Sequence, residues 1–119
     1  METDITYEGW SNRATWLANL WLSNDRSLYD DALRTVATGV DRGWAMAILG
    51  EMLVADLMSR MQLDLRSGSD AMYLDFCPFD GERVIPEINR VELAEHWLAD
   101  LEDARAHGEI IRPRMIGAQ

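Results

Sequence analysis

Lysine is missing from this chain of 119 residues, and cysteine occurs only once. All eleven basic residues are arginines, a bias that no folding rule requires. Because Cys77 cannot form an intramolecular disulfide by itself, the cysteine framework of a small secreted protein is excluded. Glu2 and Asp4 also place negative charge where a signal peptide carries positive charge. We therefore expect a cytoplasmic protein.

The chain also lacks a long apolar run. Its most apolar stretch, residues 44–58, includes Glu51 and Asp56. A membrane-spanning helix needs roughly 20 consecutive apolar residues, so this stretch is too short and too charged. We expect a buried helix here and no contact with a membrane.

Motifs that mark catalysis are missing as well. The sequence has no glycine-rich phosphate loop, no Gly-x-Ser-x-Gly elbow and no paired-cysteine metal motif. Glu92 and His96 could share one ion, but a metal site usually needs three or four ligands. Asp75 and Asp80 flank Cys77, and an acidic neighbourhood makes a thiol a poor nucleophile. We expect no enzyme activity, no cofactor and no metal.

Negative charge is abundant: 21 acidic residues oppose 11 basic ones, for a net charge of −10. Proteins that bind DNA or RNA gain most of their affinity by neutralising phosphates with Lys and Arg. Direct nucleic-acid binding is therefore disfavoured. A basic protein surface is the partner that this charge fits.

Hydrophobic periodicity predicts a mainly α-helical single domain over residues 1–119, with about four helices packed around a central one at about 42–66. Residues 69–88 lose this periodicity and are expected to form an irregular segment or a short β-hairpin turning at Asp80-Gly81. Residues 112–119 are expected to form a flexible tail.

Four polar positions are predicted to begin the helices. Asn12, with Ser11 before it, fits an N-cap for a helix that runs to about Ser23. Ser27 with Asp30 resembles a capping box for a second helix that ends near Gly39. Asp41 is expected to cap the central helix. Asn89, with Glu92 at the third helical position, should cap the last helix, which stops at Gly108.

Helical spacing also predicts which residues face inward. The large side chains Trp16, Leu17, Leu20 and Trp21 recur at helical intervals in the first helix, and core packing is the simplest reading of them. In the central helix the positions that follow a helical period, and are expected to face inward, are Trp44, Ala47, Ile48, Met52, Ala55, Met58 and either Met61 or Gln62. The central helix is apolar on most sides, which indicates neighbours packed around it.

The last helix carries an acidic side opposite its apolar side. Five acids and no arginine lie between Val91 and Ala104. A solvated face that keeps the protein soluble would explain them. Yet like charges at helical spacing repel mildly, and a basic partner would relieve that repulsion. The candidate partner-binding acids are Glu92, Glu95, Asp100, Glu102 and Asp103 in this helix, supported by Asp70, Asp75, Asp80 and Glu82.

Residues 7–25 carry a more specific pattern. The run Gly9-Trp10-Ser11-Asn12, followed by Thr15-Trp16 and Asn19-Leu20-Trp21-Leu22, resembles the N-terminal signature of small uncharacterised proteins of phages, plasmids and other mobile elements. Residues 91–100 are similar to the C-terminal helix of the same proteins. The resemblance implies a mobile-element origin, a bacterial host cell and no established catalytic residues.

Origin and charge together suggest two functions. Mobile elements must survive restriction nucleases and CRISPR effectors, whose DNA channels are lined with Lys and Arg, and an acidic protein can occupy such a channel as a DNA mimic. The first hypothesis is therefore an anti-defence (anti-CRISPR or anti-restriction) inhibitor. The alternative is a structural or regulatory protein that self-associates, for example as a homodimer, through exposed Trp and Met.

Overall fold

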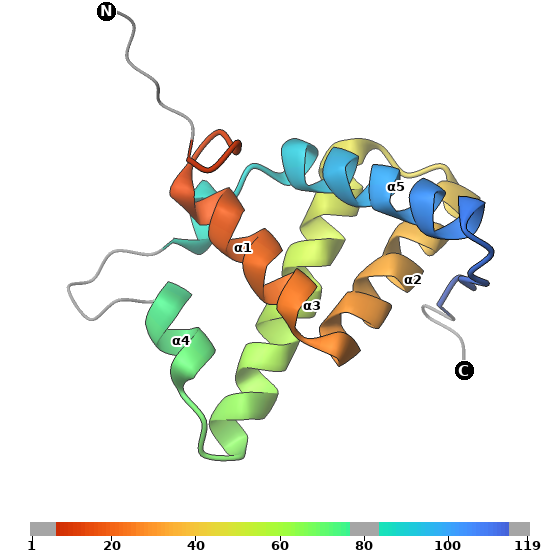
Figure 1. Ribbon diagram of the computed structural model, residues 1–119. Coiled ribbons are helices and arrows are strands. Elements are labelled where there is room, and N and C mark those ends of the chain that lie inside the picture. The colour runs from red at the N-terminus through yellow and green to blue at the C-terminus, as the bar shows by residue number, and fades with distance from the viewer. Residues whose placement is uncertain (1–6, 77–83, 115–119) are drawn as a thin grey trace, which may run out of the picture.

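The computed structural model describes residues 7–76 and 84–114, and these residues are mainly helical, as the sequence predicts (Figure 1). Between Tyr7 and Trp10 a tight turn is closed by two backbone hydrogen bonds. The elements that follow are α1 (Arg13–Asn24), α2 (Arg26–Arg42), α3 (Met46–Arg66), α4 (Ala71–Phe76), the 3-10 turn η1 (Ile85–Glu87) and α5 (Arg90–Ala106).

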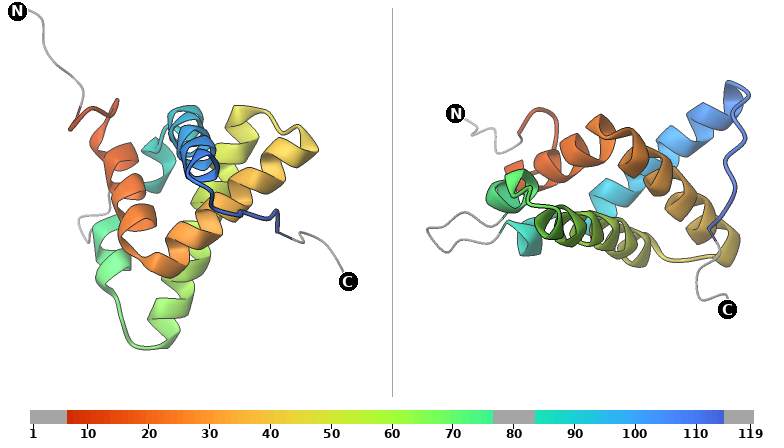
Figure 2. Two further views of the ribbon diagram at one scale, coloured as in Figure 1. Left: turned by 45° about the vertical axis from the view of Figure 1, so that its right-hand side comes forward. Right: turned by 90° about the horizontal axis from the view of Figure 1, so that it is seen from below.

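The long helix α3 is central to the packing, which confirms the predicted organisation. It contacts α1, α2, α4 and α5, and α5 crosses one end of it (Figures 1 and 2). The crossing is close because Gly50 lies directly under the backbone of Arg90, where any Cβ would overlap the Arg90 carbonyl. A glycine at this position therefore lets the two helices approach each other.

Two of the predicted helix starts are wrong. The side chain that caps α2 is Asp25, which accepts a hydrogen bond from the backbone N–H of Leu28, and Ser27 lies inside the helix. Helix α2 then continues past Gly39 to Arg42, so Asp41 belongs to α2 and does not cap α3. Helix α3 begins at Met46, four residues later than predicted, without a side-chain cap.

The inward positions predicted for the central helix are mostly wrong: Met61 is buried, but Ala47, Ile48, Ala55 and Met58 are exposed. Ile48 and Met58 are 53% and 42% exposed, whereas Leu53 and Leu57 are fully buried. The apolar residues of α3 occupy more than one side, so periodicity alone could not tell which side meets its neighbours. The buried positions of this helix are Leu49, Gly50, Leu53, Val54, Leu57 and Met61.

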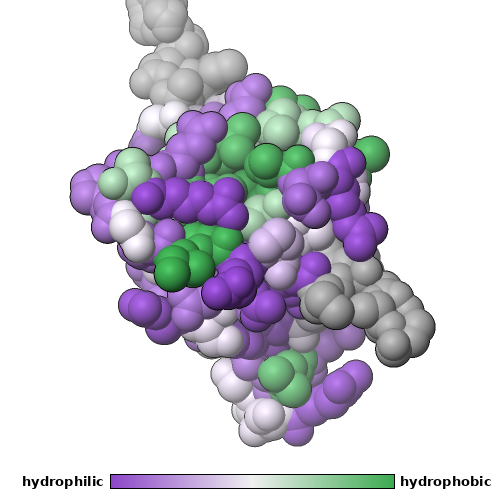
Figure 3. All heavy atoms as spheres, turned by 90° about the vertical axis from the view of Figure 1, so that its right-hand side faces the viewer, coloured by the Kyte–Doolittle hydropathy of each residue, from purple (hydrophilic) through white to green (hydrophobic). Residues whose placement is uncertain are grey.

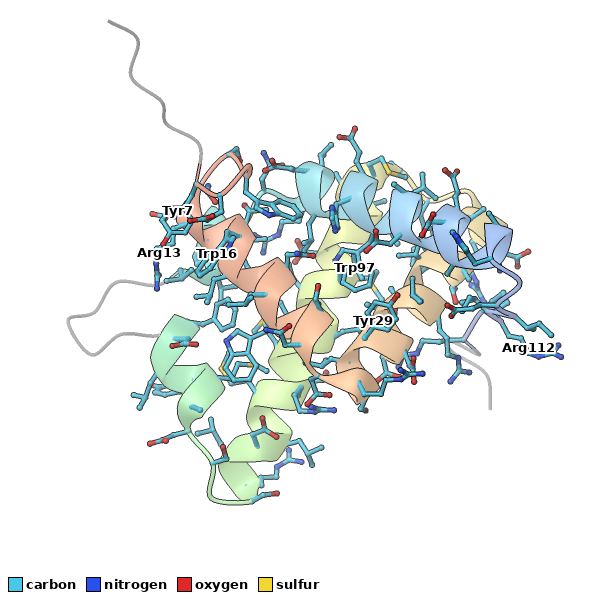
Figure 4. The ribbon with its side chains drawn as sticks, in the orientation of Figure 1. Tyr7, Arg13, Trp16, Tyr29, Trp97 and Arg112 are labelled. Atoms are coloured by element: carbon cyan, nitrogen blue, oxygen red, sulfur yellow. The ribbon has the colours of Figure 1, made fainter. Side chains whose placement is uncertain are left out.

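The buried apolar side chains form one cluster, to which α1 to α5 all contribute. Trp97 is its largest fully buried member and projects from α5 toward Tyr29 on α2, with 5.5 Å between the ring centroids (Figure 4). The indole N–H of Trp97 has no hydrogen-bond acceptor within the described residues. Trp16 and Trp21 are partly buried against the same cluster and Leu17 belongs to it, as predicted for the first helix, whereas Leu20 is exposed. Trp10, which precedes the helix, is also partly buried against the cluster.

The segment predicted to be irregular contains two short helical elements. Helix α4 packs Met72 and Phe76 into the core, and η1 leads into α5. The proposed turn at Asp80-Gly81 lies outside the described residues. No helix in the described part of the chain is long and apolar enough to span a membrane.

Candidate partner-binding surface

Helix α5 carries acids on its outer side and on one flank. The buried side consists of Leu93, Ala94, Trp97, Leu101 and Ala104, which face α2 and α3. Glu95, Glu102 and Asp103 are exposed, and Asp100 is half-buried. Glu95 and Glu102, seven residues apart, lie opposite the packed side, whereas Asp100 and Asp103 lie on the flank of the helix that borders Tyr29. Each of these carboxylates is at least partly accessible to a partner without any change in the core.

Glu92, the first of the candidate partner-binding acids, makes hydrogen bonds that hold the fold together. Its carboxylate accepts the Ser11 hydroxyl at 2.6 Å and the Ser11 backbone N–H at 3.1 and 3.2 Å. These bonds join the turn before α1 to the first turn of α5, 81 residues away. Glu92 is thus a fixed part of the fold, whereas Glu95 and Glu102 make no hydrogen bond or ion pair within the described residues.

Two acids of α5 pair with histidines, one on the same helix and one directly after its end. Asp100 lies 3.4 Å from His96 Nε2, and Asp103 lies 3.6 Å from His107 Nδ1. A hydrogen bond to the Asp103 backbone carbonyl, followed by the charge of its carboxylate, raises the pKa of His107. All four side chains are at least one-third exposed, so these pairs are weak and leave the carboxylates open to competing cations.

A hollow of about 310 Å³ borders this acidic side. It is lined by Tyr29, Asp100, Asp103, Ala104, His107 and Glu109. The pKa of the Tyr29 hydroxyl is raised, first by burial and then by the charges of Asp100 and Glu109. The same carboxylates favour a cation at this end of α5. Hydrophilic side chains surround smaller hydrophobic patches over the end of the molecule where α5 stops (Figure 3).

The supporting acids lie elsewhere. Asp70 is exposed just before α4, and the Asp75 carboxylate accepts a hydrogen bond from Trp21 Nε1 at 2.9 Å. Helix α4 lies at the opposite end of the molecule from the C-terminal end of α5 (Figures 1 and 2). Asp80 and Glu82 lie outside the described residues. The structure therefore does not bring Asp70 and Asp75 into one surface with the acids of α5.

The His96 side chain lies against Trp10, with 4.8 Å between the ring centroids, and pairs with Asp100. Across residues 7–76 and 84–114, no group of three His, Cys, Asp or Glu side chains could hold a metal ion.

The N-terminal signature residues form a joint between α1 and α5. The Asn12 side chain accepts the Thr15 backbone N–H at 2.8 Å, capping α1, and donates to the Glu87 carbonyl at 2.9 Å. The Thr15 hydroxyl in turn accepts the backbone N–H of Asn89 at 2.8 Å. Asn89 caps α5, since its side chain accepts the Glu92 backbone N–H at 3.0 Å. Both predicted N-caps are thus confirmed, and Thr15 couples them.

Sequence reasoning missed one buried polar cluster. Thr35 and Thr38 on α2 and Asp56 on α3 surround Arg114, a residue assigned to the tail. Thr35 and Thr38 lie three residues apart among core positions, which is a weak signal for a buried polar contact. Nothing local in the sequence connects them with Asp56 or Arg114.

No curated protein and no solved structure matches the chain. A family model matches residues 3–93, which extend from the segment before α1 into the first turn of α5. The match stops before Glu95, Asp100, Glu102 and Asp103, so it carries no information about most of the acidic side. The chain belongs to the Family of unknown function (DUF7249).

Proposed function

We propose that this protein is an acidic anti-defence inhibitor that binds a basic, nucleic-acid-binding effector of a bacterial host and blocks it. The acidic face, defined as Glu95 and Glu102 on the outer side of α5 with Asp100 and Asp103 on its flank, would make the contact. The observation that carries the proposal is the outward orientation of this face on a chain of net charge −10. The effector would be a CRISPR effector or a restriction nuclease.

Geometry supports a mechanism based on charge. Glu95 and Glu102 are seven residues apart, which places their Cα atoms about 10 Å apart along the helix. Exposed carboxylates at this spacing can pair with Lys and Arg side chains that otherwise hold DNA phosphates. An occupied channel cannot admit DNA, so inhibition needs no chemistry from the inhibitor.

The experiment is an affinity capture from bacterial lysates that carry CRISPR and restriction systems, read by mass spectrometry. The tagged protein should retain a nucleic-acid-binding defence subunit at low salt and release it at high salt, because surface charge pairs are screened. Glu95→Arg with Glu102→Arg should abolish the capture without unfolding the domain. Equal capture by this double variant would contradict the assignment of the face.

A matched control reverses two other acids. Asp41 on α2 and Asp64 on α3 make no side-chain hydrogen bond or ion pair within the described residues. Asp41→Arg with Asp64→Arg changes the net charge as much as the reversal of Glu95 and Glu102 does. The control variant should still capture the effector. Capture by the control but not by the Glu95 and Glu102 variant would show that binding depends on this surface and not only on the net charge of the protein.

A second function is favoured by a different observation. Large apolar side chains are exposed on the C-terminal half of α3 and on α4. They are Met58, Leu63, Leu65, Tyr73 and Leu74, each with an exposed fraction between 41% and 54%. A protein that self-associates as a structural or regulatory component would cover such a surface. Its contacts would come from Met, Leu and Tyr, because the tryptophans are at least partly buried. Sedimentation discriminates the two, since an apolar oligomer persists at high salt.

A further inference from the structure

A polar site between α2 and α3 holds the last described residue, Arg114. The Arg114 guanidinium donates through Nη1 to Asp56 Oδ1 at 2.9 Å and to Thr35 Oγ1 at 3.0 Å. The Thr35 hydroxyl also donates to Asp56 Oδ2 at 2.7 Å. Thr38 Oγ1 accepts the backbone N–H of Arg114 at 2.6 Å. Side chain and backbone of one arginine are therefore recognised together.

The site is built for a cation. Thr35 and Thr38 are 1% exposed, and the Asp56 side chain is 14% exposed. Burial raises the pKa of Asp56 in spite of the hydrogen bonds from Thr35 and the charge of Arg114. A largely buried carboxylate without a counter-charge is strongly unfavourable, so the site either holds a cation or takes up a proton. A planar guanidinium can reach Asp56 and Thr35 at once.

The C-terminal segment, residues 109–114, is attached to the rest of the protein mainly through this site. Ile110 is 78% exposed, Ile111 packs partly against the core, and Arg105 donates to the Ile111 carbonyl. The segment turns back from the end of α5 along the outer side of α2, with no other helix over it (Figures 1 and 2). Segments with few buried apolar contacts open at a lower cost than the whole domain.

An open groove surrounds the bound arginine. Its volume is about 440 Å³, and it is lined by Arg34, Thr35, Met52, Ala55, Asp56, Ser59 and Arg114. Arg112 does not enter this groove and points away from the molecule (Figure 4). Once the C-terminal segment leaves the groove, an incoming side chain could thus contact Asp56 and Thr35 in its lining.

We propose that this groove is a binding site for a guanidinium group, which Arg114 fills in the free protein and an arginine of a basic protein partner fills in a complex. The C-terminal segment is then a tethered competitor, which lowers the apparent affinity of every ligand of this site by the same factor. The site itself follows from the geometry, while the nature of the incoming partner rests on the proposed function.

The test uses Arg114→Ala in the full-length chain, with n-propylguanidinium as the probe and n-propylammonium as the control. The guanidinium should raise the melting temperature of this variant in a saturable manner, by about 3–6 °C at ten times its dissociation constant. The n-propylammonium control should raise the melting temperature much less. Because Arg34 lines the same groove and could occupy it, the titration is repeated with Arg34→Gln added.

The double variant Asp56→Asn with Arg114→Ala lacks the carboxylate and should lose the response. An equal response with and without Asp56, or no response in any Arg114→Ala background, would overturn the inference. If Arg114→Ala does not fold, recovery of helical circular dichroism by n-propylguanidinium alone would support the site, and no recovery would refute it. None of these readouts involves the effector, so they can fail independently of the proposed function.

Discussion

Glu92 should contribute far more to stability than Glu95, although both are acids of the exposed half of α5 and lie three residues apart. The Glu92 carboxylate accepts the hydroxyl and the backbone N–H of Ser11. A hydrogen bond to a charged group contributes about 1.5–3 kcal/mol when buried. Since the bonds between Glu92 and Ser11 are only part-buried, we expect Glu92→Ala to lower the free energy of unfolding by about 2 kcal/mol in total.

Urea unfolding followed by circular dichroism measures this difference. For a domain of this size the slope is about 2 kcal/mol per M, so the midpoint of Glu92→Ala should fall by about 1 M. Glu95→Ala is the matched control, because it removes the same side chain from the same helix without breaking a described bond. It should stay within about 0.5 kcal/mol of the parent protein. Equal losses in both variants would refute the structural role of Glu92.

Two further predictions concern packing and pH. Gly50→Ala should destabilise the domain by about 1–3 kcal/mol in urea unfolding, because its Cβ would overlap the Arg90 carbonyl; a gain in stability would contradict the close crossing. The Leu28 N–H and then Arg60 lower the pKa of Asp25 from 3.8, so the stability it contributes is present above pH 3.8 and is lost as pH falls through the folded-state value. The stability gap between the parent protein and Asp25→Ala should therefore narrow on acidification, and a constant gap would exclude this linkage.

Local signals in the sequence predicted the parts of the fold that depend on neighbouring residues. Asn12 and Asn89 cap their helices through backbone N–H groups only three residues away, so the capping pattern is contained within one turn. In α5 the buried Trp97 and Leu101 and the exposed Glu95 and Glu102 also follow helical spacing. In each of these cases, the residues that decide the structure are close together in the chain.

The errors have a common physical cause. Asp25 and Ser27 can both accept a hydrogen bond at the start of α2, and the 2.7 Å ion pair of Asp25 with Arg60 on α3 favours the former. The inward side of α3 is likewise decided by the helices that pack against it. Choices between locally equivalent residues are made by tertiary contacts, which a single sequence does not reveal.

The same limit applies to the functional surfaces. The sequence could identify the acids of α5 but could not show that Glu92 is bound to Ser11, 81 residues away. Nor could it bring Thr35 and Asp56 to Arg114, because those contacts span 79 and 58 residues. Buried polar pairs of this kind leave almost no local pattern.

The central claim is tested most directly by the affinity of a captured defence effector for the double variant Glu95→Arg with Glu102→Arg. We predict a loss of at least about tenfold relative to the parent protein, because reversed charges repel a basic surface, with higher salt weakening the parent complex. The control Asp41→Arg with Asp64→Arg should change the affinity by less than about threefold. Equal losses in the two variants, or an affinity independent of salt, would contradict binding through the acidic face of α5.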